Sequence, residues 1–502
     1  MNITELTGNE IRDFGEHVSL VFEGQEFTNI ELDKTARKLG NVLQKLGVKR
    51  GDRVIIQMPN CPEVFQSFWA VWRIGAVAVP MNYLIGEEES AYIYHDCGAE
   101  TVISSAEFLQ KIETCRAKAP AVKNVILIEE EVPQGCYSYR ELIRESSDKL
   151  ETAKTADDDL AALVYTAGTT GKPKGVIHSH YSLYSNAKMV IDTLTLPERG
   201  VSIFVLPLCH MYGIGAMIAG SLKGGGKAVV LSTFDVAKIF ESIEKYKGNT
   251  LAGVPTMYVY MLLYPEPEKY DLSSMQLWTS GSAPLALETW KGFKEKFGFE
   301  IIEGWGLTEA AALNSVNPVE GPIKVGSIGK PMKGTEMKIV DNKDRELTFG
   351  QEGEIIIRSP SLMKGYWNKP EETAETLRNG WVYTGDVGYV DEDGYFFITE
   401  RKKNIIIKAG ENISPREIEE VIFAYHKVSE AAVVGIGDDV YGEDIKAFVV
   451  LKPGEQATEE ELIEYCRTRL KTFKTPREIQ FMDSLPKNIV GKVLKKDLRK
   501  LG

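Results

Sequence analysis

Short runs of β-branched and apolar residues alternate with helix-forming stretches through the first half of this 502-residue chain. Residues 53–58 form one such run, residues 64–74 have helical spacing, and residues 76–80 form the next run. Similar runs recur at 101–103, 124–128 and 227–231. Parallel strands need crossover connections, which place helices on the faces of the sheet. The alternation therefore predicts an α/β fold with mixed or parallel sheets flanked by helices.

The pattern of the sequence changes near residue 335. From there, short strand-like runs separated by turns replace the alternation of strand-like and helix-forming stretches. Strand-like runs at 337–340, 353–357 and 394–398 predict a β-rich subdomain over about 335–400. A basic run follows at 401–404. Beyond it, the pattern predicts helices and strands at 415–423, 431–436, 447–451 and 459–470. We therefore expect a large domain over 1–400 and a small α+β domain over 401–502.

The overall charge excludes one large class of partner. The chain carries a formal net charge of −13, whereas a dedicated nucleic-acid binder needs a strong basic surface. The N-terminal residues lack the basic stretch and apolar run of a secretion signal, and the apolar windows are too short to span a bilayer. We expect a cytoplasmic protein with no integral membrane segment. A homodimer is compatible with the sequence.

One glycine-, threonine- and lysine-rich string stands out directly after the strand-like residues 160–164. Its backbone N–H groups, hydroxyls and charges suit a phosphate-binding loop. It is not a Walker A loop, because Thr166 and Pro173 stand where Gly and Ser or Thr are required. The candidate nucleotide-binding residues are Thr166, Ala167, Gly168, Thr169, Thr170, Gly171, Lys172 and Lys174.

This string closely resembles the signature loop of the adenylate-forming superfamily, which includes acyl-CoA synthetases, peptide-synthetase adenylation domains and beetle luciferases. Further motifs follow in the order of that family over nearly the whole chain. The resemblance implies a large N-terminal domain and a small, mobile C-terminal domain. It also implies formation of an acyl-adenylate from a carboxylate and ATP, usually followed by transfer of the acyl group to a thiol.

Two further segments resemble parts of the nucleotide site of this family. Residues 304–309 resemble its YGxTE segment, with Trp305 in place of the more usual tyrosine. Thr308 would bind phosphate, while Glu309 would hold Mg²⁺ together with Thr169. A small-residue loop at 281–283 resembles the segment that lines the adenine and acyl sites. These motifs add Gly281, Ser282, Ala283, Glu303, Gly304, Trp305 and Gly306 to the expected nucleotide-binding residues.

The C-terminal motifs complete the resemblance. Asp386 matches the family's ribose-binding aspartate, and Arg401 matches the arginine that grips the ribose or phosphate, with Ile398 nearby. Lys403 stands at the hinge position, or is a solvated surface lysine. The resemblance places Lys408 and Gly410 on the loop that moves toward the thiol tunnel. Lys492 matches the catalytic lysine, the alternative being one more lysine in a basic C-terminus.

The residues that would surround the acyl group are mostly small or apolar. The expected pocket comprises Met211, Tyr212, Gly213, Gly281, Gly306 and Ala311. His210 would gate access to this pocket, would face the carboxylate or ATP, or is simply a core histidine. The segment 201–232 contains no acidic residue, which argues against an amino-acid substrate.

The expected activity is an acyl-CoA synthetase that uses ATP, Mg²⁺ and coenzyme A. Its substrate would be an acid with an apolar tail: a medium- or long-chain fatty acid, or an alicyclic or aromatic acid. One alternative is an adenylating enzyme that loads a carrier-protein thiol or another acceptor. A nucleotide-binding relative without catalysis is the third alternative.

Overall fold

The structure is a computed structural model that describes residues 1–502 apart from 167–171, 439, 488–490 and 502. Its first sheet has eight strands in the order β19-β9-β8-β4-β3-β5-β6-β7. The strands from β8 to β7 in this order are parallel, whereas β9 pairs antiparallel with β8 and β19 pairs antiparallel with β9. The bounds are β3 (Arg53–Gln57), β4 (Val77–Pro80), β5 (Thr101–Ser104), β6 (Asn124–Leu127), β7 (Tyr137–Ser138), β8 (Leu160–Thr166), β9 (Lys174–Ser179) and β19 (Gly365–Tyr366).

The second sheet has nine strands in the order β16-β15-β14-β13-β12-β10-β11-β1-β2. The six strands from β14 to β1 in this order are parallel, and antiparallel strands close both ends. The bounds are β1 (Val18–Phe22), β2 (Gln25–Thr28), β10 (Val201–Phe204), β11 (Lys227–Val230), β12 (Thr250–Gly253), β13 (Leu277–Ser280), β14 (Ile301–Leu307), β15 (Ala312–Val316) and β16 (Lys330–Pro331).

The largest apolar core lies between these two sheets, where helices α3 (Pro62–Arg73), α7 (His180–Thr193) and α8 (Met211–Lys223) pack. Phe68, Trp72 and Ile214 are fully buried there, and Trp72 Nε1 donates a hydrogen bond to the carbonyl of Ala161 at 2.8 Å. The remaining helices of this part are α1 (Glu5–Phe14), α2 (Asn29–Lys45), α4 (Glu87–Cys97), α5 (Leu109–Lys118), α6 (Tyr139–Glu145), α9 (Val236–Tyr246), α10 (Pro255–Leu263) and α11 (Leu287–Phe297).

A β-rich part follows the nine-stranded sheet. It contains β17 (Glu336–Val340), β18 (Gly353–Arg358), β20 (Leu377–Arg378), β21 (Trp381–Val390), β22 (Phe396–Arg401) and the short helix α12 (Pro370–Thr376). Ile355, Ile357 and Val382 are fully buried in its core, and Trp305 of β14 packs into the same core. This shared core fixes the β-rich part against the end of the nine-stranded sheet.

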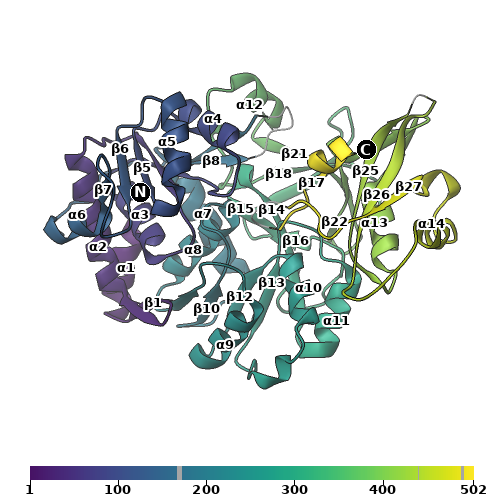
Figure 1. The fold of residues 1–502 in the computed structure, drawn as a ribbon, viewed down its shortest axis with the longest axis horizontal. Helices are drawn as coiled ribbons and strands as arrows, with labels where there is room; N and C mark the ends of the chain where they lie inside the picture. The colour runs from purple at the N-terminus through teal and green to yellow at the C-terminus, as the bar shows by residue number, and fades with distance from the viewer. Residues whose placement is uncertain (167–171, 439, 488–490, 502) are drawn as a thin grey trace.

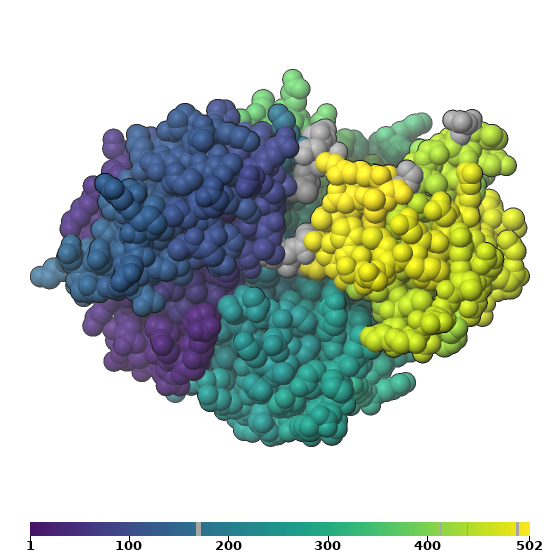
Figure 2. Space-filling model, in the orientation of Figure 1, coloured from purple at the N-terminus to yellow at the C-terminus, as the bar shows by residue number. Residues whose placement is uncertain are grey.

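The C-terminal lobe has a five-stranded sheet and its own core, and lies to one side of the larger body (Figures 1 and 2). It contains β23 (Ile406–Lys408), β24 (Glu411–Ile413), β25 (Val428–Asp438), β26 (Gly442–Leu451), β27 (Glu478–Phe481), α13 (Pro415–Phe423), α14 (Glu459–Arg467) and α15 (Lys495–Leu498). β22 ends at Arg401 and β23 begins at Ile406. The domain boundary at 401 stays a prediction.

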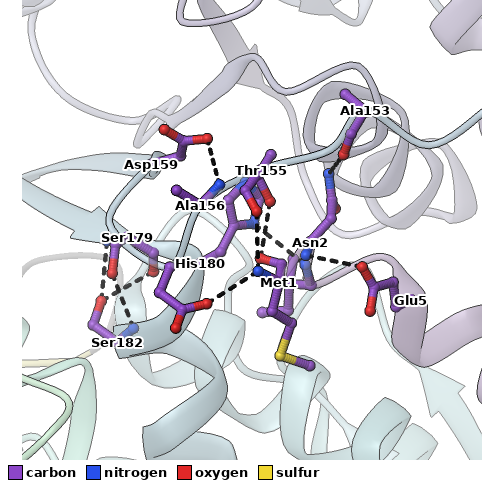
Figure 3. Close-up of polar contacts among 12 residues, drawn as sticks. Met1, Asn2, Glu5, Ala153, Thr155, Ala156, Asp159, Ser179, His180 and Ser182 are labelled. Atoms are coloured by element: carbon purple, nitrogen blue, oxygen red, sulfur yellow. Dashed lines mark hydrogen bonds and ion pairs between the residues drawn. The ribbon is translucent and has the colours of Figure 1, made fainter.

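The first residues of the chain are held against the start of α7 and the segment 153–159 (Figure 3). The ammonium group of Met1 donates to the carbonyl of Thr155 at 3.1 Å, and Asn2 Nδ2 donates to the carbonyl of Ala153 at 3.1 Å. Ser179 and Ser182 form a capping box at the start of α7. These contacts position α1, which begins at Glu5.

The predicted fold class is confirmed: α/β sheets in a large N-terminal part, a β-rich part, and a small α+β C-terminal part. No helix in the described ranges is both long enough and apolar enough to cross a bilayer.

Candidate active site

Asp386 is the centre of a polar cluster where the β-rich part meets the nine-stranded sheet. Its side chain is buried. Oδ2 accepts a hydrogen bond from Trp305 Nε1 at 3.0 Å, and Oδ1 lies 2.6 Å from Arg401 Nε. The β21–β22 register places Asp386 directly opposite Arg401. A carboxylate has about four lone-pair sites, so both oxygens keep the capacity to accept from a vicinal diol such as ribose.

Lys492 lies in the same electrostatic environment, although it belongs to the C-terminal lobe. The charge of Arg401, together with burial, lowers the pKa of Lys492 to about 7. Burial, with a smaller contribution from the charge of Lys492, lowers the pKa of His210 to about 4. The carbonyl oxygen of Gly491 lies 3.5 Å from the hydroxyl of Thr256 on α10. The structure therefore brings Lys492, Arg401 and His210 into one site at the junction of the lobes.

Glu309 and Thr308 lie on a single turn of 3₁₀ helix, η3 (Thr308–Ala310), that neighbouring side chains hold in place. The hydroxyl of Tyr366 donates to Glu309 Oε1 at 2.8 Å, and Lys174 Nζ lies 5.0 Å from the Tyr366 ring centroid. His178 Nε2 lies 2.6 Å from the carbonyl oxygen of Thr308. Burial lowers the pKa of His178 to about 4, so the ring is neutral. Nε2 must carry its proton, because a carbonyl only accepts.

The phosphate-binding loop joins β8 to β9. Thr166 ends β8 and Lys174 begins β9, and the two residues are antiparallel partners. Lys172 Nζ lies 5.4 Å from the ring centroid of Tyr92 on α4. Five of the predicted loop residues, Ala167, Gly168, Thr169, Thr170 and Gly171, lie outside the described residues. The described ends place Lys174 close to Tyr366 and, through it, to Glu309.

The chemistry of the donor groups decides whether a magnesium ion fits. Within the described ranges, no group of three or more His, Cys, Asp or Glu side chains is placed to hold a metal ion. Glu309 offers one carboxylate, with Oε1 already bonded to Tyr366. Nucleotide-associated Mg²⁺ is commonly held by one or two carboxylates, with phosphate oxygens and waters as the other ligands. Glu309 therefore fits Mg²⁺ that binds together with ATP.

Two predicted nucleotide-site glycines allow β14 and β15 to approach each other closely. A methyl group on Gly306 would lie 1.5 Å from the carbonyl oxygen of Ala312. One on Gly304 would lie 2.7 Å from Leu313 Cδ1. Glycine is thus required by the backbone at residue 306, independently of any ligand.

The small-residue loop after β13 is tied to Glu303. Glu303 is buried, and its Oε1 accepts from the backbone N–H of Leu285 at 3.1 Å. Burial raises the pKa of Glu303 to about 7. Within the loop, Ser282 has a φ of 69°, a left-handed conformation that is uncommon outside glycine and is often found at functional sites. Ala283 follows it, half-buried.

An elongated cavity of about 230 Å³ begins beside this site. Tyr212 and Gly304 line one end, where the Tyr212 hydroxyl lies 3.2 Å from Thr279 Oγ1. The lining then crosses the nine-stranded sheet beneath α8, where Ala216 and Gly220 contribute to it. Because Tyr212 follows His210 by two residues, this end of the cavity lies near Lys492.

Of the six predicted acyl-pocket residues, all of them described by the structure, Tyr212 alone lines this cavity. A methyl group on Gly281 would lie 3.2 Å from the Tyr212 ring. Met211 and Ala311 are buried in the core between the two large sheets. Gly213 lies against the backbone of Pro207, since a methyl group there would be 2.4 Å from its carbonyl oxygen. Gly306 lies on β14, as described above.

Four other predicted residues lie away from the cluster or only at its edge. Lys408 forms an ion pair with Asp444 inside the C-terminal lobe, and Gly410 is exposed on the β23–β24 turn. Lys403 lies on the short turn η4 (Lys402–Asn404) between β22 and β23. Ile398 of β22 packs against the β-rich core.

Sequence reasoning missed several residues that position the site. His178 and Tyr366 hold the turn that carries Thr308 and Glu309. Thr279 contacts the Tyr212 hydroxyl, and Asn186 Nδ2 donates to the carbonyl of Leu313 at 2.7 Å. The sequence held one signal for these residues. His178 lies only four positions after Lys174, the last lysine of the phosphate-binding loop.

Comparison with known proteins decides the family. A family model described as AMP-binding enzyme matches residues 9–367, and one described as AMP-binding enzyme C-terminal domain matches residues 417–492. The chain belongs to the AMP-binding enzyme family. The resemblance seen in the sequence is thereby confirmed for this AMP-binding enzyme.

Similar curated proteins are named as ligases of carboxylic acids. A long-chain-fatty-acid–CoA ligase of Bacillus subtilis is 36% identical, with 97% of this chain and 92% of that protein covered. A feruloyl-CoA synthase of an Amycolatopsis species is 34% identical, with 95% and 94% covered. Both cover almost the whole AMP-binding enzyme.

Solved structures agree in fold. An anthranilate CoA ligase in complex with anthranoyl-AMP superposes with a TM-score of 0.93 at 30% identity, with 100% of this chain and 97% of that chain covered. ATP-bound MatB from Rhodopseudomonas palustris gives a TM-score of 0.91 at 32% identity, with 100% and 98% covered.

Proposed function

We propose that this AMP-binding enzyme is an ATP-dependent acid–CoA ligase whose substrate is a long-chain fatty acid. The comparisons confirm the expected class of activity, ATP-dependent ligation of an acid to coenzyme A. The relatives differ in the acid that their names specify, and the cavity is what favours a long acyl chain.

The observation that carries this proposal is the reach of the cavity. Its lining includes residues of β13, β12, β10, β11 and β1, which are consecutive neighbours in the sheet. Adjacent strands lie about 4.8 Å apart, so four intervals span about 19 Å. Carbon–carbon bonds near 1.5 Å advance an extended chain by about 1.3 Å per carbon, so this reach takes roughly fifteen carbons. An aryl acid would fill only the inner part.

The described residues suit adenylation at the inner end. A carboxylate oxygen of the acid attacks the α-phosphorus of ATP, the bond to the β-phosphate oxygen breaks, and pyrophosphate leaves. We propose that Lys492 bridges the carboxylate and α-phosphate, and that Asp386 and Arg401 hold the ribose. Stabilisation of the developing charge by prepositioned groups is the main source of catalysis in phosphoryl transfer.

The phosphates of ATP and the Mg²⁺ ion that accompanies them would be held by the lysine-rich loop and the η3 turn. We propose that Lys174 and the loop from Thr166 to Lys172 bind the β- and γ-phosphates, and that Glu309 and Thr169 hold Mg²⁺. When bound, Mg²⁺ supplies positive charge to the departing pyrophosphate. Thr308 offers its hydroxyl to phosphate, with its carbonyl fixed by His178.

The second step is attack of the coenzyme A thiol on the acyl carbonyl, with release of AMP. In the conformation described, Lys408 and Gly410 belong to a hairpin of the C-terminal lobe that lies away from Asp386. We propose that rotation of this lobe about Lys403 withdraws Lys492 and brings the hairpin to the acyl-adenylate. Short 3₁₀ connections can absorb the backbone change that such a hinge requires.

A second candidate substrate is a hydroxylated aromatic acid. The hydroxyls of Tyr212 and Thr279 lie together at the inner end and could bind a phenol. An amine is a second candidate for the group that accepts the acyl chain. The amide bond synthetase McbA from Marinactinospora thermotolerans superposes with a TM-score of 0.88 at 25% identity.

Carboxylate-dependent exchange of pyrophosphate into ATP tests the proposal, followed by a thioester assay for every active acid. The panel is acetate, octanoate, hexadecanoate, benzoate, cyclohexanecarboxylate and ferulate. We expect hexadecanoate to give both exchange and hexadecanoyl-CoA. A preference for ferulate would favour the aromatic candidate, and exchange without a thioester would favour another acceptor.

A further inference from the structure

Helix α1 lies across the outer end of the cavity. Thr7 and Glu10 of α1 line it, together with Lys223, the last residue of α8, and Gly224 and Gly226 of the turn that follows. Thr7 and Glu10 are three residues apart, so they lie on one face of the helix. The outer end is therefore formed jointly by α1 and the glycine-rich turn that follows α8.

Contacts at both ends hold α1 in this position. Before its first turn, Asn2 Nδ2 donates to carbonyls of Ala153 and Trp72 (Figure 3 shows the former). At its other end, the ring of Phe14 covers the glycine turn. A methyl group on Gly225 would lie 2.5 Å from Phe14 Cδ1, and Gly225 has a φ of 67°. Only glycine fits both the ring and the backbone there.

Of the two α1 residues that line the cavity, Glu10 is the more buried. Its side chain is buried at 9% exposure, and Oε1 lies 3.2 Å from His17 Nε2. A buried carboxylate is costly to displace unless it stays paired. The pair with His17 therefore keeps Glu10 as a fixed polar part of the cavity wall, beside other polar lining residues such as Thr7 and Lys223.

We propose that α1 forms the end wall of the acyl channel and that Glu10 is the residue that limits the length of the acyl tail. This inference rests on the proposed long-chain acid–CoA ligase activity. A tail that reaches Glu10 would meet a polar group, and a longer tail would have to displace α1 from the glycine turn.

Gly220 offers an independent way to shorten the same channel. It lies eight residues after Tyr212 on α8, which is about 12 Å along the helix. It lines the cavity, and a Cβ atom there would have no heavy atom within 4 Å. A leucine at this position is accommodated by the fold but projects toward the space that a long tail would use.

The test compares kcat/KM for octanoate, hexadecanoate and docosanoate in Gly220→Leu and Glu10→Ala. Gly220→Leu should keep its octanoate activity and lose hexadecanoate activity by about tenfold or more, the scale on which pocket shape discriminates methylenes. Glu10→Ala should raise the docosanoate-to-hexadecanoate ratio by about tenfold. Retained octanoate turnover shows that each variant is folded.

Two control variants distinguish an effect on acyl-chain length from a general effect of substitution. Gly8→Leu places leucine at another helical glycine with no neighbour within 4 Å. It should leave the relative kcat/KM values for the three acids unchanged. Glu10→Gln keeps the size of the side chain but loses its charge, so its docosanoate-to-hexadecanoate ratio should rise less than that of Glu10→Ala. An unaltered ratio in Glu10→Ala, or equal loss of octanoate and hexadecanoate activity in Gly220→Leu, would overturn the inference. Failure of the unmodified protein to use hexadecanoate would instead overturn the proposed function.

Discussion

The indole Nε1 of Trp305 donates a hydrogen bond to Oδ2 of Asp386 across 3.0 Å. The ring itself packs into the core of the β-rich part, so the indole is an orienting group for the carboxylate. Tyrosine is the more usual residue at this position of the motif. The tryptophan therefore gives Asp386 Oδ2 a donor, while Arg401 engages both oxygens, Oδ1 at 2.6 Å and Oδ2 at 3.5 Å.

Loss of the indole donor should weaken nucleotide binding. In Trp305→Phe we expect the KM for ATP to rise about tenfold, because a hydrogen bond to a charged group is worth about 1.5–3 kcal/mol. Steady-state kinetics with ATP varied gives the measurement. Trp381→Phe, at a half-buried tryptophan on β21, is the matched control and should change KM little. Equal effects of the two variants would contradict the orienting role.

The hydroxyl of Tyr366 should set the magnesium dependence. Tyr366→Phe removes the 2.8 Å hydrogen bond to Glu309 and leaves its carboxylate less well oriented. We expect the Mg²⁺ concentration for half-maximal activity to rise by about fivefold, corresponding to roughly 1 kcal/mol. Tyr395→Phe removes a comparable bond, to the carbonyl of Pro322 at 2.6 Å, and should have no such effect. A Mg²⁺ dependence identical to that of the unmodified protein would exclude Glu309 as the ligand.

Lys492 should take up a proton when ATP binds. Its pKa is lowered to about 7, so the amine is mostly neutral in the free protein at about pH 8, and nearby phosphates favour the ammonium form. Titration calorimetry in buffers of different ionisation enthalpy should show uptake approaching one proton at about pH 8 and much less at about pH 6. Lys492→Met should abolish the difference. Uptake that persists in this variant would assign the proton to another group.

Gly306 should be required for stability as well as for the site. A methyl group there would lie 1.5 Å from the carbonyl oxygen of Ala312, which forces β14 and β15 apart. We expect Gly306→Ala to lower the free energy of unfolding by about 3 kcal/mol. Gly8→Ala, in open space on α1, should instead raise it by about 0.5–1 kcal/mol. Denaturant unfolding of both variants measures the contrast.

The sequence predicted the elements with strong periodicity and the residues with motif context. The helix over 415–423 coincides with α13, and the runs at 53–58 and 101–103 coincide with β3 and β5. Asp386 and Arg401 could be paired from sequence only through resemblance, since their contact depends on the β21–β22 register.

Other features had no local signal. Tyr366 reaches Glu309 from 57 residues away, and the cavity lining includes residues from seven strands of one sheet. Its outer end depends on α1, which is remote in sequence from α8. Such relationships arise from tertiary packing, which residue patterns along the chain do not encode.

A single turnover with hexadecanoate and ATP in the absence of coenzyme A distinguishes the proposed two-step mechanism from ATP cleavage alone. We predict stoichiometric release of pyrophosphate and an enzyme-bound hexadecanoyl-adenylate that mass spectrometry detects. Addition of coenzyme A should then convert it to hexadecanoyl-CoA and AMP. Cleavage of ATP without a hexadecanoyl-adenylate, or an adenylate that coenzyme A leaves unchanged, would contradict the proposed acid–CoA ligase mechanism.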